Sequence, residues 1–156
     1  MKPNILIALD DSENSFRAVQ YVATHFKTEQ IITLFSVIPD TEALCKMNSK
    51  ELTPYFKEQQ SAFCHLENKK REIVQQAHEK AKEILINAGF PEENIISKIA
   101  TQKHGVARDI VNEAHDGHDI IIIGRRGLSS IKEFLMGSIS HKVLNKAKNI
   151  SLAIID

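Results

Sequence analysis

The chain has 156 residues with 20 basic and 20 acidic side chains, and 42% of its residues are hydrophobic. This length predicts one domain with one core, and a net charge of zero does not favour binding to nucleic acid or to an anionic membrane. The first apolar run ends at Asp10 and Asp11, which predicts neither a signal peptide nor a membrane span. Two cysteines, Cys45 and Cys64, without metal-type spacing favour a reduced cytoplasmic location and disfavour a disulfide framework.

Strands and helices are predicted in alternation along the chain. Continuous apolar runs predict buried strands, and apolar residues three or four positions apart predict helices. The predicted strands are 4–9, 31–38, 95–100, 119–123 and 151–155. Helical stripes cover 16–26, 73–88, 107–114 and 139–147, with Ser12 or Ser15 as the first cap and Gly89 as the end of the longest helix. Residues 40–68 are predicted to be a variable loop with a separate helical segment near 55–66.

This alternation predicts the α/β fold class, with a single domain over residues 1–156. Apolar strands of this kind are typical of an open, mostly parallel sheet with helices on both faces. Right-handed crossover connections leave few possible topologies for such a sheet. Ligands of open α/β sheets bind at the carboxyl ends of the strands, where the winding direction reverses.

A glycine-rich segment follows the predicted strand 119–123. Gly124 and Gly127 are separated by two residues, and nine further residues lead to Gly137 and Ser138, where a helical pattern begins. Glycine permits close approach of the backbone to a ligand, and the start of a helix offers free N–H groups and a positive dipole end. The segment therefore predicts a phosphate-binding loop.

The spacing Gly124-x2-Gly127-x9-Gly137-Ser138 resembles the nucleotide-binding signature of the universal stress protein family, in its ATP-binding branch. Residues 5–15, which end in an aspartate turn, are similar to the first strand and turn of that family. The resemblance implies a Rossmann-like, five-stranded sheet in the order 3-2-1-4-5. It also implies a cytoplasmic stress-response module that binds ATP, ADP or AMP, together with Mg²⁺ or Mn²⁺ on the phosphates.

The resemblance further implies roles for individual residues. Ala8 and Val37 match positions that line the adenine slot, and Asp10 matches the contact to the ribose or base. An arginine of the loop could pair with phosphate. The complete predicted nucleotide-binding set is Ala8, Asp10, Val37, Gly124, Arg126, Gly127, Gly137, Ser138, Ile139 and Ser140.

Several alternatives stay open at this stage. Asp11 either caps the first helix or holds a metal, so a weak ATPase or adenylate-chemistry enzyme with a metal at Asp10 and Asp11 competes with a regulatory module. Gly127 is followed by Leu128 and not by the Lys of a P-loop, no catalytic residue is identifiable, and rapid catalysis is not expected. His115 and His118 suggest a metal site, but a favourable contact between these histidines and the C-terminus of a helix is the stronger interpretation.

The last predicted strand, 151–155, is apolar and uninterrupted by proline. In the order implied by the resemblance this strand lies at the edge of the sheet, where unpaired backbone groups must be covered or paired. Twofold pairing with a second copy is the commonest oligomer symmetry. We therefore expect a homodimer through residues 151–155.

Overall fold

The computed structural model describes residues 3–46, 53–127 and 136–156. Within these ranges the strands form a five-stranded sheet in the order β3-β2-β1-β4-β5, and every neighbouring pair is parallel. This architecture confirms the predicted α/β class and strand order. The strands are β1 (Asn4–Ala8), β2 (Ile31–Ile38), β3 (Ile95–Thr101), β4 (Ile120–Gly124) and β5 (Ser151–Ile155).

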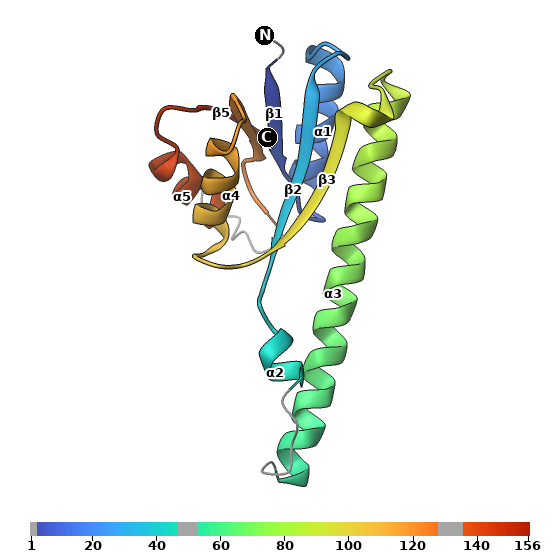
Figure 1. Ribbon diagram of the computed structural model, residues 1–156, viewed down its shortest axis with the longest axis vertical. Coiled ribbons are helices and arrows are strands. Elements are labelled where there is room, and N and C mark those ends of the chain that lie inside the picture. Colours follow the sequence, from blue (N-terminus) through green and yellow to red (C-terminus); the bar gives the residue numbers. More distant parts are fainter. Residues whose placement is uncertain (1–2, 47–52, 128–135) are drawn as a thin grey trace.

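Helices cover both faces of the sheet (Figure 1). α1 (Glu13–His25) and α3 (Pro54–Asn87) pack on one face, and α4 (Val106–His115) and α5 (Ser138–Lys146) pack on the other. A short helix, α2 (Glu42–Lys46), lies beside α3, and a 3₁₀ turn (Glu92–Asn94) precedes β3. In the part of the chain that the structure describes, no helix has the length and apolar character needed to span a bilayer.

The core has two layers because successive strand residues point to opposite faces. In β1, Ile5 and Ile7 belong to the cluster beneath α1 and α3, whereas Leu6 and Ala8 belong to the cluster beneath α4 and α5. Burial of a large aliphatic side chain stabilises a fold by roughly 1.5–3 kcal/mol. The continuous apolar runs read from the sequence thus supply both layers at once.

Helix α3 differs from its prediction. Residues 54–87 form one helix of 34 residues, not a segment near 55–66 followed by a second helix. Pro54 stands in the first turn, where proline is tolerated, and residues 55–87 contain no glycine or proline to interrupt the helix. The end is as predicted, because Gly89 takes a positive φ of 97° directly after the cap residue Ala88.

The expectation that the cysteines stay unpaired is wrong. Cys45 of α2 and Cys64 of α3 form a disulfide across 19 positions of sequence. The amide of Gln60 also donates to the carbonyl of Leu44 at 2.5 Å, so α2 is attached to α3 at two points. The sequence pattern had indicated no helix over residues 42–46, and without that helix nothing placed Cys45 beside Cys64.

A buried histidine joins α3 to the sheet. His78 Nε2 lies 2.7 Å from Ser36 Oγ, and Nδ1 lies 2.7 Å from Ser97 Oγ. The Ser36 hydroxyl donates to the carbonyl of Leu9, so Nε2 carries the imidazole proton and Nδ1 accepts from Ser97. Burial lowers the pKa of His78 to about 4, which keeps the ring neutral near pH 7. The network fixes the end of β1 immediately before Asp10.

This network predicts a loss of stability in mild acid. The unfolded chain binds a proton at His78 as the pH falls through about 6.5. The folded chain binds this proton only when the pH has fallen to about 4. Stability from His78 is therefore fully present above pH 6.5 and declines as the pH falls toward 4. We expect His78→Gln, which cannot titrate, to show a smaller drop in melting temperature than wild type between about pH 7 and about pH 5. Thermal melts should show no such difference for His65→Gln, because His65 is exposed.

Candidate functional site

The carboxyl ends of β1 and β4 lie side by side at the centre of the sheet. Ala8 pairs with Ile123 in the parallel register, and Asp10 and Gly124 follow at the same edge. Gly127 reaches back to this point, because a Cβ atom added to it would lie 2.8 Å from Asp10 Oδ2. The aspartate turn and the glycine loop, 117 positions apart in sequence, therefore form one site.

The turn after β1 is held by hydrogen bonds. Asp10 Oδ1 accepts from the backbone of Ser12 at 2.8 Å, and the backbone of Asp10 donates to Ser15 Oγ at 2.9 Å. Ser12 caps α1 by accepting from the N–H of Ser15 at 3.2 Å. These contacts assign the cap to Ser12, leave Asp11 exposed, and leave Asp10 Oδ2 facing Gly127.

The end of β4 is fixed by close packing and one hydroxyl. Gly124 is buried, and a Cβ atom there would lie 2.8 Å from the carbonyl carbon of Asn14 in α1. Ser140 Oγ, itself buried, donates to the carbonyl of Gly124 at 2.7 Å. The proton of this hydroxyl is thus used inside the protein, and Ser140 positions the end of β4.

Helix α5 begins beside the glycine loop. Gly137 is its N-cap and has no side chain to satisfy the first turn, while its own N–H donates to the carbonyl of Arg125 at 2.8 Å. The N–H groups of Ser138, Ile139 and Ser140 occupy that first turn, where a helix has unsatisfied donors and a positive dipole end. Ser138, the first residue of that turn, is exposed to solution.

Two arginines of the loop carry buried donors. The Nε atoms of Arg125 and Arg126 are buried and have no acceptor among the described residues. Arg125 reaches Asp156 Oδ2 at 2.8 Å through Nη2. A buried donor without an acceptor costs about 1–3 kcal/mol, so an anionic ligand beside Arg126 would relieve that cost. Lys132, a further basic residue between Gly127 and Gly137, lies outside the described residues.

The predicted adenine contacts share one apolar surface. Ala8 is buried in the cluster beneath α4 and α5, and Val37 and Ile139 are half-buried against the same cluster. Val37 lies near the end of β2, next to β1 in the sheet. The structure therefore brings the apolar candidates, the carboxylate of Asp10 and the start of α5 to the same edge of the sheet.

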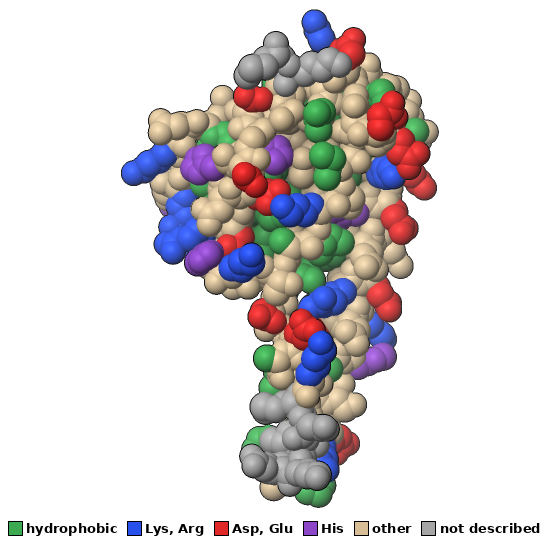
Figure 2. Space-filling view, in the orientation of Figure 1, with side chains coloured by type: hydrophobic (Ala, Val, Ile, Leu, Met, Phe, Trp, Pro, Cys, Tyr) green, Lys and Arg blue, Asp and Glu red, His purple; other side chains and the backbone are tan. Residues whose placement is uncertain are grey.

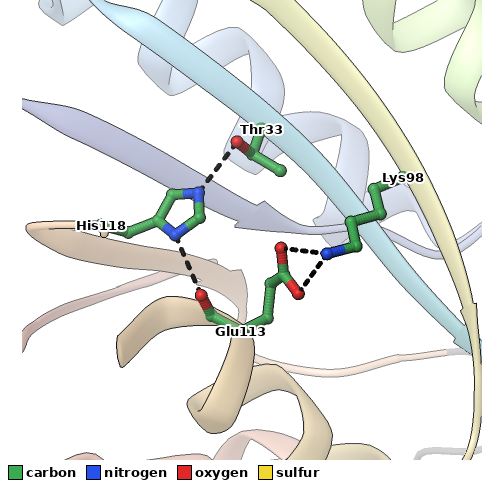
Figure 3. A network of polar contacts seen from close by, with 4 residues as sticks. All are labelled: Thr33, Lys98, Glu113 and His118. Atoms are coloured by element: carbon green, nitrogen blue, oxygen red, sulfur yellow. Dashed lines mark hydrogen bonds and ion pairs between the residues drawn. The ribbon is translucent and has the colours of Figure 1, made fainter. Parts of the chain in front are cut away.

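The histidines that suggested a metal are bonded within the protein. His118 donates from Nδ1 to the carbonyl of Glu113 at 3.1 Å and lies 2.9 Å from Thr33 Oγ1 through Nε2 (Figure 3). Beside it, the carboxylate of Glu113 binds Lys98 at 2.7–2.8 Å. His115 donates to the carbonyl of Lys148. Among the described residues, no three acidic, histidine or cysteine side chains gather closely enough to hold a metal.

Sequence reasoning missed the residues that position this site. Asn14 limits the space at Gly124, and Ser15 and Ser36 hold the backbone on either side of Asp10. The sequence indicates Ser15 only as an alternative to Ser12 for the helix cap. No sequence signal identifies Asn14 or Ser36, because their roles depend on which strands are neighbours.

Comparison with known proteins agrees with this geometry. The model of the universal stress protein family matches residues 1–154. Universal stress protein YxiE of Bacillus subtilis (strain 168) is 32% identical over 142 residues, which cover 89% of each chain. The solved structure of hypothetical protein MJ0577 is similar with a TM-score of 0.73 and 27% identity, covering 99% of this chain and 96% of that one.

A universal stress protein solved in complex with cAMP has the same fold, with a TM-score of 0.64 and 15% identity. The match covers 99% of this chain and 96% of that one. The family model spans both the aspartate turn and the glycine loop, which the structure brings into contact. The chain therefore belongs to the universal stress protein family.

Proposed function

We propose that this protein binds ATP, or the related ADP or AMP, at the edge where β1 and β4 end. The observation that supports this most strongly is the closeness of Gly127 to Asp10, since a Cβ atom added to Gly127 would lie 2.8 Å from Asp10 Oδ2. A carboxylate that accepts hydrogen bonds from ribose hydroxyls then lies beside a loop suited to phosphate. One solved universal stress protein binds cAMP, and that complex is consistent with an adenine nucleotide bound on this fold.

Each part of the nucleotide has a proposed partner. The base packs on the apolar surface formed by Ala8 and Val37, and the ribose donates to Asp10. The phosphates accept from the first turn of α5, starting at Ser138, and approach the backbone at Gly127. Arg126 supplies one of the two buried donors that have no acceptor among the described residues. Gly124, Gly137 and Ser140 keep the loop in place through internal contacts.

We propose a regulatory role in the stress response, in the cytoplasm, rather than rapid catalysis. In this arrangement Asp10 is used for binding, because Oδ1 accepts from the backbone of Ser12 and Oδ2 is the proposed acceptor for the ribose. A bound Mg²⁺ or Mn²⁺ would be held mainly by the phosphates, with Asp11 as the nearest exposed carboxylate in sequence. The competing function, slow ATP hydrolysis with a metal at Asp10 and Asp11, is an outcome that the experiments below separate.

Gly127→Ala should weaken ATP binding at least tenfold, equivalent to about 1.4 kcal/mol. The new Cβ atom would lie 2.8 Å from Asp10 Oδ2 and would displace that carboxylate. Ser138→Ala removes a hydroxyl but keeps the backbone N–H, so its effect should be smaller. Calorimetric titration measures both, and thermal melts check that the variants fold. Equal affinity of wild type and Gly127→Ala for ATP would show that the glycine loop is not part of the ATP site.

Asp10→Asn should weaken ATP binding while leaving the turn intact, because the amide oxygen can still accept from Ser12. Asp11→Asn is the matched control, since Asp11 is exposed one residue away. When Mg²⁺ is absent, Asp10→Asn should bind ATP more weakly than wild type, and Asp11→Asn should bind ATP as tightly as wild type. If wild type instead hydrolyses ATP near 1 s⁻¹, within the usual range of enzymes, and Asp10→Asn abolishes this, the enzyme function replaces our proposal.

We also propose that β5 pairs with its copy in a homodimer. β5 is the edge strand next to β4, and the backbone groups of Leu152 and Ile154 alternate with those bonded to β4, so they face outward. Ile154→Lys should lower the mass measured by light scattering at micromolar concentration. Ser151→Lys, at an exposed position of the same strand, should leave it unchanged. An identical mass for Ile154→Lys and wild type would exclude this interface.

A further inference from the structure

The N-terminal half of α3 extends away from the sheet as a stalk, as Figures 1 and 2 show. Five large apolar side chains between residues 55 and 73 of α3 are exposed, and a group of exposed apolar side chains often marks an interaction surface. We call them the α3 stripe: Tyr55 (65% exposed), Phe56 (57%), Phe63 (38%), Leu66 (53%) and Ile73 (42%).

The α3 stripe lies on one side of the helix. At about 100° per residue, its five members fall within a sector roughly 100° wide. Farther along the helix the same sector contains Ala77 and Ala81, which are buried against the body of the domain. The apolar face that packs on the sheet in the second half of α3 thus continues along the stalk, where the sheet no longer covers it.

Helix α2 does not cover the α3 stripe. Its two attachments, at Gln60 and Cys64, lie on the flank of α3 next to the stripe, since Cys64 is turned about 100° from Phe63. Helices in proteins gain most of their stability from packing against other elements. The disulfide and α2 therefore support the stalk from the side while the stripe stays open.

The charge of the α3 stripe is balanced. Within the sector of the stripe the one charged group is Lys70, which binds the buried Glu67 at 2.9 Å. An apolar face with a neutralised ion pair does not attract a phosphate backbone or an anionic membrane. The chemistry fits a partner whose own surface is apolar and neutral.

We propose that the partner is the α3 stripe of a second copy, packed antiparallel about a twofold axis. The apolar residues follow a heptad pattern in which Phe56 and Phe63 occupy one seam position and Leu66 and Ile73 the other. With the axis between residues 64 and 65, Phe63 meets Leu66 of the second copy and Phe56 meets Ile73. Both pairs form in the same register, so the stripe is complementary to itself.

Polar residues are compatible with this register. Lys70 lies opposite Gln59 of the second copy, whose amide oxygen can accept a hydrogen bond, and the two copies of Lys70 stay roughly 16 Å apart along the helix. Aromatic side chains present about 150–250 Å² each when fully exposed. The partly exposed stripe would bury on the order of 500 Å² per copy, at the lower end of specific interfaces. A reversible dimer follows.

The first test measures mass in the Ile154→Lys background, which removes any contribution from β5, and it is independent of nucleotide binding. Light scattering from low to high micromolar concentration should show a monomer–dimer equilibrium. Phe63→Lys should abolish the dimer. Ile86→Lys is the matched control, because Ile86 is also exposed (40%) on α3 but lies on the opposite side of the helix. A monomer at every concentration, or a dimer unaffected by Phe63→Lys, would overturn the proposal.

The second test measures the register. In the same Ile154→Lys background, Phe63→Lys and Leu66→Glu should each be monomeric alone, whereas an equimolar mixture should form a heterodimer through the lysine and glutamate that face each other. Circular dichroism checks that α3 stays helical in both variants. Failure of the mixture to associate would reject the antiparallel register. Co-sedimentation of a monomeric protein with phosphatidylcholine vesicles, lost in Phe63→Lys, would assign the stripe to a membrane and overturn the proposal.

Discussion

The site depends on the absence of space where β4 ends and α1 begins. No side chain fits at Gly124, because the backbone of Asn14 occupies the position of its Cβ atom. This close packing lets the loop after β4 turn across the end of β1, and it places Gly127 against Asp10. A larger residue at Gly124 would separate the ends of β1 and β4, and the residues of the site would then no longer lie close together.

Hydrogen bonds from outside the site keep this arrangement rigid. Ser36 and His78 hold the carbonyl of Leu9 from the side of α3, and Ser140 holds the carbonyl of Gly124 from the side of α5. Helices on opposite faces of the sheet thus fix the last backbone groups of neighbouring strands. A ligand then meets a preorganised surface, which reduces the entropy lost on binding.

The strands could be predicted from the sequence because each is a short apolar run, and their observed bounds differ from the prediction by no more than a residue. The strand order came from the resemblance of residues 5–15 and 124–138 to a known family, since periodicity alone does not order a sheet. The long α3 and the disulfide between Cys45 and Cys64 were missed. Residues 40–68 have a polar, mixed composition that is typical of a loop, so the sequence did not reveal that the segment near 55–66 continues without a break into the longer helix.

The candidate site, too, could be predicted from the sequence only in part. Its glycines and Asp10 have a recognisable spacing, but Asn14, Ser36 and His78 act through neighbours that are distant in sequence. From the sequence the apolar residues of α3 are indistinguishable from ordinary buried helix positions, because a pattern does not reveal which part of an amphipathic face lacks a core to cover it.

The central place of β1 has a consequence for synthesis of the chain on the ribosome. β1 is made first, and β2 can pair with it early, but its other neighbour, β4, is more than a hundred residues later. During translation one edge of β1 therefore stays unpaired and apolar until most of the chain has emerged. Such long-range parallel pairing slows folding and exposes aggregation-prone surface. We expect nascent chains shorter than about 125 residues to be substrates for chaperones, because the sheet cannot close around β1 before that length.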